Sequence, residues 1–165
     1  MPDTDTTVTN APATLGGFCD HTAVRDAVPW PGDTFVIIEK ASGRAITQIN
    51  GELQLEVNAS RRGNFYWVCF ERGGWLGFYN TASGNYMGHN GGTGKLQAEV
   101  RQIRGYEYLC CFCVRRHPAG GYLLLSMHTG AWNLEPVAID QDGIGLVVRE
   151  YGGAVWEFVK IRNFA

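Results

Sequence analysis

Hydrophobic and polar residues alternate over short stretches along much of this chain. Residues 53–57 read Leu-Gln-Leu-Glu-Val, so three apolar side chains share one face of an extended segment and two polar ones share the other. An Asn-Gly pair precedes this stretch, and Asn-Gly beside alternating segments is the strongest short-range signal for a β-hairpin. In the first part of the chain, the pattern therefore predicts short strands joined by tight turns over 35–39, 45–49, 53–57 and 65–70.

The same pattern returns further along the chain. Gly-Glu-Leu-Gln-Leu-Glu-Val at 51–57 reappears as Gly-Lys-Leu-Gln-Ala-Glu-Val at 94–100, and a more divergent copy lies at 145–151. Repetition with a period of this size is typical of architectures built from similar units. The chain divides into three units of about four strands each, near 33–73, 74–120 and 121–162.

Twelve strands in three similar units predict a β-trefoil, which is a six-stranded barrel closed at one end by three hairpins. Closing the barrel removes the exposed sheet edges that would invite aggregation. We therefore predict an all-β chain, with a single β-trefoil of three pseudo-symmetric four-stranded units over 33–165 and very little helix. The repeated motif is then a turn followed by a core strand, and it serves the fold.

Residues 1–32 lie outside the repeats and are predicted to form a partly flexible N-terminal extension. Within it, residues 18–28 predict a short helix with Asp20 as its N-cap, ended by the prolines at 29 and 31. We expect the extension to act as a strap over the open end of the barrel, either simply packed there or serving as the lid of a ligand cavity. The apolar residues expected to cover the barrel are Phe18, Val24, Val28 and Trp30.

The segment 73–100, GGWLGFYNTASGNYMGHNGGTGKLQAEV, resembles the fascin-type, actin-crosslinking branch of the β-trefoils, and the third unit is similar through GGYLLLS, GLVVRE and AVWEFVKI. The resemblance covers about residues 33–162 and rests on turn glycines and core positions, so it implies a fold more than an activity. Fascins bundle actin with several trefoils in tandem. This chain has one, so crosslinking by it would require a dimer. The ricin-type branch would show Gln-x-Trp near the end of each unit, and its absence from this sequence argues against a ricin-like sugar site.

Charge and composition narrow the classes of partner. The net charge of −2 gives no electrostatic footprint for nucleic acid or for an anionic membrane. No stretch approaches the roughly 18 apolar residues that a membrane-spanning helix needs. The N-terminus is rich in threonine and acidic residues, whereas a secretory signal has basic residues followed by an apolar run, so a cytoplasmic protein is expected.

The cysteines fit that expectation. There are five, an odd number, and three of them crowd together as Cys110, Cys111 and Cys113. Cys-Cys-x-Cys lacks the further soft ligands that a zinc site needs at regular spacing. We therefore expect free structural thiols, no metal site and no cofactor.

Functional residues are expected at positions where the three units differ, because the positions they share serve the fold. The third unit carries an irregular stretch over 126–136, and its Trp132 matches no aromatic residue in the equivalent turns. A tryptophan with polar neighbours offers the flat apolar face and the hydrogen-bonding groups that sugar recognition uses, although a core-filling tryptophan has the same sequence signature. The candidate ligand-binding residues are Trp132, Asn133, His128, Tyr86, Asn85 and His89.

The same region holds the candidate acid–base residues, should the chain be an enzyme. They are His128, Glu135, Asp140 and Asp142. Asp140 and Asp142 resemble half of a calcium-binding loop, but the glutamate that completes such a loop is missing, so we interpret them as a hairpin turn. No familiar catalytic motif is present.

Two hypotheses follow. The leading one is a non-catalytic binding module, a monomer or weak dimer, that recognises a glycan or a protein surface through loops of the second and third units. The alternative is a small enzyme of the cyclase or isomerase type, from specialised metabolism, that shapes a non-polar small molecule in an aromatic pocket with histidine and carboxylate help.

Overall fold

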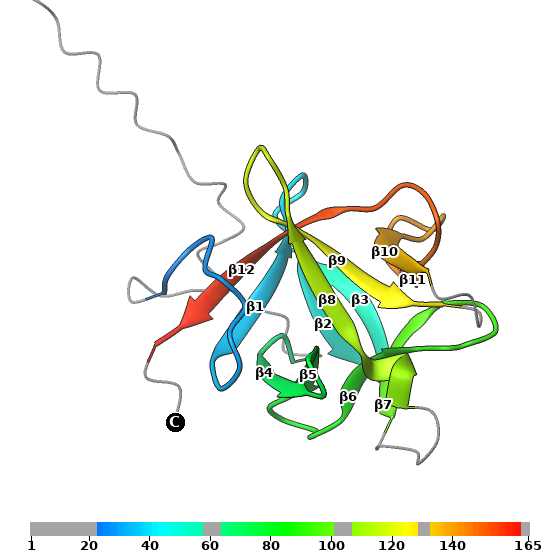
Figure 1. The fold of residues 1–165 in the computed structure, drawn as a ribbon, viewed down its shortest axis with the longest axis horizontal. Coiled ribbons are helices and arrows are strands. Elements are labelled where there is room, and N and C mark those ends of the chain that lie inside the picture. Colours follow the sequence, from blue (N-terminus) through cyan, green and yellow to red (C-terminus); the bar gives the residue numbers. More distant parts are fainter. Residues whose placement is uncertain (1–22, 58–63, 101–106, 129–132, 163–165) are drawn as a thin grey trace, which may run out of the picture.

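The computed structural model describes residues 23–57, 64–100, 107–128 and 133–162, and these residues form twelve β-strands (Figure 1). A 3-10 turn spans Glu107–Cys110, and no α-helix occurs within the described ranges. The strands are β1 (Thr34–Glu39), β2 (Ala45–Ile49), β3 (Glu52–Glu56), β4 (Trp67–Arg72), β5 (Trp75–Asn80), β6 (Tyr86–His89), β7 (Leu96–Val100), β8 (Phe112–Arg116), β9 (Tyr122–Met127), β10 (Leu134–Ile139), β11 (Leu146–Val148) and β12 (Val155–Ile161).

Six of these strands close into a barrel through antiparallel pairing. The ring runs β1–β4–β5–β8–β9–β12 and returns to β1. The other six strands form three hairpins, β2–β3, β6–β7 and β10–β11. Each unit therefore supplies two barrel strands and one hairpin, and the predicted all-β β-trefoil is confirmed.

The three hairpins bond to one another in a cycle. Each of the first two repeat motifs begins at a hairpin turn, and in the third hairpin Ile144 takes the place of that leading glycine. Three equivalent backbone hydrogen bonds link the hairpins: Leu55 N to Ile144 O at 2.9 Å, Ala98 N to Gly51 O at 2.9 Å, and Val148 N to Gly94 O at 2.8 Å. A fully buried leucine stands two residues after each of the acceptors Gly51, Gly94 and Ile144, and these leucines are Leu53, Leu96 and Leu146. We call this ring of bonded hairpins the cap.

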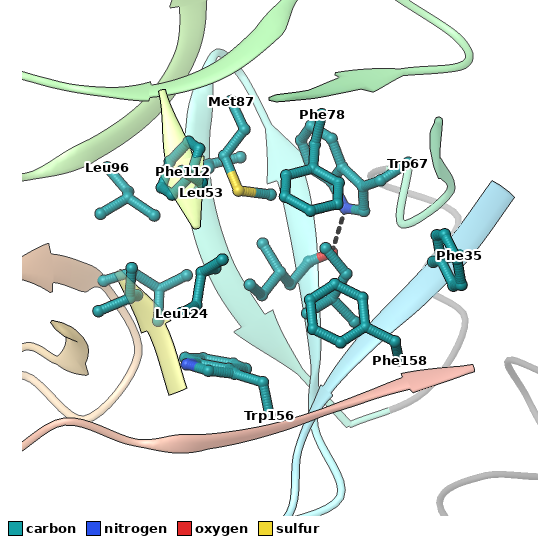
Figure 2. Close-up of a cluster of buried hydrophobic side chains, with 14 of the residues drawn as sticks. Phe35, Leu53, Trp67, Phe78, Met87, Leu96, Phe112, Leu124, Trp156 and Phe158 are labelled. Carbon is teal, nitrogen blue, oxygen red and sulfur yellow. Dashed lines mark hydrogen bonds between the residues drawn. The ribbon is translucent and has the colours of Figure 1, made fainter. Parts of the chain in front are cut away.

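Aromatic side chains fill the interior of the barrel (Figure 2). Trp67, Phe112 and Trp156 occupy equivalent positions of β4, β8 and β12, and all three are fully buried. Trp67 Nε1 donates a hydrogen bond to the carbonyl oxygen of Ile46, 3.0 Å away, and so ties the barrel to the first hairpin. The units that repeat in the sequence therefore share one core.

The N-terminal extension does not form the predicted helix where the structure describes it. Residues 23–28 form no helix, because Val24 pairs with Lys160 of β12 through two backbone hydrogen bonds of 2.8 Å. β12 pairs with β9 only at Val155 and Trp156, so the rest of this edge of β12 is free to bond to the N-terminal extension. Its backbone groups satisfy the N–H and C=O of Val24, which a helix would have satisfied internally.

The expected cover of the barrel is also partly wrong. Val28 is 61% and Trp30 is 66% exposed, whereas Pro29 between them is buried and Ala27 packs against the core. Small residues of the extension therefore pack inward while its large apolar ones face solvent. Phe18 and Asp20 lie outside the described residues.

The described cysteines form no disulfide. They are Cys69, Cys110, Cys111 and Cys113, while Cys19 lies outside the described ranges. Burial raises the pKa of the Cys69 thiol to about 12. In the part of the chain that the structure describes, no cluster of three histidine, cysteine or acidic residues is suited to hold a metal ion, and no helix is long and apolar enough to cross a membrane.

Gly94→Ala is expected to destabilise the protein more than Gly84→Ala does. Both glycines have positive φ, 76° and 70°, so each substitution strains the backbone by about 1–2 kcal/mol. A Cβ at position 84 would meet nothing within 4 Å, whereas one at position 94 would lie 2.4 Å from the carbonyl oxygen of Val148 in the cap. We expect overpacking to add about 1–3 kcal/mol at position 94 alone, measured by urea unfolding. Equal costs for the two variants would contradict the importance of the cap.

Candidate functional site

Three of the predicted site residues, His89, His128 and Glu135, lie together where the second and third units meet. The rings of His89 and His128 have centroids 5.6 Å apart and stand at 90° to each other. His128 Nδ1 lies 2.9 Å from Glu135 Oε2, and His89 Nε2 lies 2.6 Å from the carbonyl oxygen of Met127. We call these three residues the histidine cluster.

The histidine cluster is largely buried against the cap. His89 is fully buried, and the side chains of His128 and Glu135 are only 13% and 16% exposed. Gly94 makes room for the His128 ring, since a Cβ there would lie 3.1 Å from it. Burial lowers the pKa of His89, and its hydrogen bonds to backbone carbonyls offset part of that effect. Glu135 orients the His128 imidazole as a carboxylate orients a catalytic base, but little of the pair reaches the surface.

The other predicted ligand-binding residues have different neighbours. Tyr86 is half-buried, and its ring packs edge-on against Phe70 at a centroid distance of 5.4 Å. Asn85 lies in the β5–β6 turn, where its carbonyl oxygen accepts a hydrogen bond from Asn80 N at 2.8 Å. Asn133 is exposed, and Trp132 lies outside the described residues.

Asp140 and Asp142 lie in the β10–β11 turn, as the interpretation of a hairpin turn predicted. Asp142 Oδ1 accepts hydrogen bonds from the backbone N–H groups of Ile144 at 2.9 Å and Gly145 at 2.8 Å, and these bonds lower the pKa of Asp142. Asp140 Oδ1 accepts one from Gln141 N at 2.7 Å. Both carboxylates thus stabilise the turn.

A second place emerges from the structure. A groove of about 670 Å³ is lined by residues of the β1–β2 turn, the β8–β9 loop and the β11–β12 connection. The ribbon of Figure 1 shows these three connections at one end of the barrel. The volume of the groove is within the range of sites for small ligands. Its lining includes Glu39, Lys40, His117, Ile139, Arg149 and Gly152–Val155.

Arg149 occupies a fixed position in the groove. Its Nε donates to the carbonyl oxygen of Tyr151 at 3.1 Å, and its Nη2 donates to that of Ile139 at 3.2 Å. The guanidinium carbon lies 5.0 Å from the centroid of the Tyr151 ring, a cation–π arrangement. Tyr151 itself is 71% exposed, so an aromatic surface stands open beside a held hydrogen-bond donor.

The remaining polar groups of the groove have distinct roles. His117 Nδ1 accepts a hydrogen bond from Ala119 N at 3.1 Å, so in the neutral ring the hydrogen resides on Nε2, which is a donor. Glu39 is 7% exposed and engaged internally, through a hydrogen bond from Ser42 and an ion pair of 3.9 Å with Arg44. The groove therefore presents mainly donors.

Sequence reasoning missed this groove because its residues come from distant segments, and because Tyr151, the aromatic residue beside Arg149, sits in the third copy of the scaffold motif. The hairpin bonds align Leu146 with Leu53 and Leu96, which places Arg149 where the first two copies have Glu56 and Glu99. The change from glutamate to arginine at this position was the sequence signal that could have pointed to the groove.

The fold has solved counterparts, although no protein-family model matches the chain and the search of curated proteins found no match. It is similar to a GH43 β-1,3-galactosidase, with a TM-score of 0.65 and 14% identity over 87% of this chain and 30% of that one. It is also similar to a GlcNAcα1-4Gal-releasing endo-β-galactosidase from Clostridium perfringens, with a TM-score of 0.65 and 12% identity over 79% of this chain and 33% of that one.

A third counterpart is the ricin B-like lectin of Macrolepiota procera in complex with lactose, with a TM-score of 0.59 and 14% identity over 82% of this chain and 99% of the lectin. The chain thus spans about a third of the length of each galactosidase and nearly all of the lectin. At these identities the likeness shows the fold, and it agrees with the β-trefoil built above.

Lowering the pH from 7 to 5 is expected to destabilise the protein through His89. The pKa of a histidine in an unfolded chain is about 6.5, and burial lowers the pKa of His89 in the folded chain. Below about pH 6.5 the unfolded chain therefore binds more protons at this residue. Its contribution to stability is complete above that pH and is lost as the pH falls toward the folded pKa.

Urea unfolding at several pH values measures this effect. His89→Gln should show a flatter dependence between pH 7 and 5 than the unmodified chain, while the half-buried His117→Gln control should keep the original slope. An unchanged slope in His89→Gln would rule out this residue as the source.

Proposed function

We propose that this chain is a non-catalytic β-trefoil module that binds a glycan, and that the groove is its sugar site. The observation that carries the proposal is the exposed ring of Tyr151 beside the fixed guanidinium of Arg149 at the groove. A sugar has an apolar face that stacks on an aromatic ring and hydroxyl groups that accept hydrogen bonds at its edge. Lys40, Arg149 and His117 supply the donors.

The form of the groove favours binding over catalysis. It is open to solvent, which suits a glycan that is held by a few of its residues. Catalysis by acid–base groups gains from excluding water, and an open groove does not exclude it. The solved neighbours support the ligand class, because their names refer to lactose and to galactosidases.

The loops of the second and third units contribute to this site through the β8–β9 loop and the β11–β12 connection, together with the β1–β2 turn of the first unit. A protein surface as the ligand, membership of the fascin-type branch, and a cytoplasmic location all stay predictions. The loop after β9, which carries Trp132, stays a second candidate for the binding site.

The enzymatic alternative has one observation in its favour, the 2.9 Å contact between His128 and Glu135. Its other proposed acids, Asp140 and Asp142, are engaged in a turn. A substrate would have to reach a pair that is mostly buried against the cap. The binding module accounts better for the exposed groups of the groove.

Tyr151→Ala is expected to weaken glycan binding without altering stability. Because the ring is 71% exposed, its removal should change the free energy of unfolding by less than about 0.5 kcal/mol. By analogy with bases stacked on aromatic residues, affinity should fall by about 1–3 kcal/mol. A glycan array identifies the ligand, and calorimetry on the best hit measures the loss.

Trp30→Ala is the matched control for this experiment. Trp30 is 66% exposed and precedes the start of β1, whereas the groove lies at the other end of that strand. Unchanged affinity in Tyr151→Ala, or an equal loss in Trp30→Ala, would count against the groove.

Trp132→Ala separates the groove from the loop after β9 in the same assay. If the groove binds the sugar, Trp132→Ala should retain full affinity while Tyr151→Ala loses it. The reverse result would place the site in the loop that contains Trp132.

A further inference from the structure

We infer that the groove selects acidic glycans, with a sugar carboxylate seated among Lys40, Arg149 and His117. The inference rests on the proposed function and adds the charge of the ligand to it. A carboxylate would be recognised here by the two charged donors and by the imidazole N–H, all of which line one groove.

Five of the ten lysine and arginine side chains in the described ranges form ion pairs with acids. The ion pairs are Arg25–Glu157, Arg44–Glu39, Lys95–Glu52, Arg116–Asp26 and Lys160–Asp33. Within the described ranges Lys40 and Arg149 take part in no such pair, and both line the groove. Unpaired cations also occur at Arg72, Arg115 and Arg162, which are not part of its lining.

Glu39, the acid in the groove lining, and Asp26, an acid that Lys40 influences, both have basic partners. Glu39 is engaged by Ser42 and Arg44. Asp26 is held by both guanidinium nitrogens of Arg116 at 2.8 and 2.7 Å, and these bonds, more than the weaker influence of Lys40, lower the pKa of Asp26. The lining of the groove thus carries two cations, Lys40 and Arg149, against one acid, Glu39.

The local backbone positions Lys40. A Cβ on Gly121 would lie 2.8 Å from Lys40 Cδ, and one on Gly120 would lie 3.1 Å from Lys40 Nζ, so the lysine lies across two residues without side chains. Thr81 stands at the equivalent place in the second unit. Lys40 is thus particular to this groove, whereas the glycine pair beneath it repeats Gly73 and Gly74 of the scaffold.

Arg149 is preorganised in a similar way. Two backbone carbonyls and the Tyr151 ring hold its guanidinium, so little side-chain entropy remains to be lost when a ligand binds. The guanidinium N–H groups that these two carbonyls leave unused can donate to the oxygens of a carboxylate. A uronate or sialate ring stacked on Tyr151 would bring its carboxylate to these groups.

The test uses the full chain and a panel of uronate- and sialate-containing oligosaccharides, each paired with its methyl ester. The acid and its ester share every sugar contact and differ in charge. We expect an affinity at least about tenfold higher for the acid, which corresponds to 1.4 kcal/mol, with the difference shrinking in 0.5 M NaCl. Lys40→Met and Arg149→Gln should each reduce the acid-to-ester ratio several-fold, while the exposed control Arg72→Gln should leave it unchanged.

The outcomes separate this inference from the proposed function. Equal binding of acids and esters would overturn the acidic selectivity and leave the glycan module standing. Binding to no glycan, acidic or neutral, would overturn both. An acid preference that survives in both Lys40→Met and Arg149→Gln, with unchanged thermal melts, would show that other groups read the charge and would also overturn the inference.

Discussion

Three backbone hydrogen bonds at the closed end of the barrel hold the hairpins in a ring, and the rest of the structure depends on them. Each bond joins one unit to the next, from Leu55 to Ile144, from Ala98 to Gly51 and from Val148 to Gly94. Each hairpin donates one of these hydrogen bonds to a neighbouring unit, so each unit depends on a neighbour to satisfy that backbone group. Buried backbone groups without such partners would cost free energy at every turn. In the repeated G-x-L sequence, the glycine accepts one of these hydrogen bonds and the leucine is buried in the core.

The cap also decides what the histidine cluster can do. His128 packs against Gly94, the residue whose carbonyl oxygen accepts the hydrogen bond from Val148 N. The cap therefore covers His128 and Glu135 and leaves little of this pair exposed to a ligand. Buried groups that pack together stabilise a junction, whereas a ligand is recognised by groups that still face water. The groove meets the second condition through Lys40, which lines it, and through Tyr151, which lies beside its Arg149, and both are exposed.

Scaffold and chemistry are therefore divided between the positions where the units agree and those where they differ. Threefold equivalence governs the leucines of the cap and the large aromatic residues of the barrel. The groove departs from that equivalence at Lys40, where the second unit has Thr81, and at Arg149, where the other motifs have a glutamate. A symmetric scaffold tolerates such departures because they lie outside the shared core, so a site can be altered without altering the fold.

The sequence by itself determined the strands, the three units and the β-trefoil, because alternation and Asn-Gly turns act between neighbours in the chain. It also placed Asp140 and Asp142 in a turn, again a local matter. It did not determine the path of residues 23–28, where the free edge of β12 prevailed over local helix signals. Nor could it determine the groove, since Lys40, His117 and Arg149 are far apart in the chain. They meet only because β12 lies between β1 and β9 when the barrel closes, and no local pattern encodes that pairing.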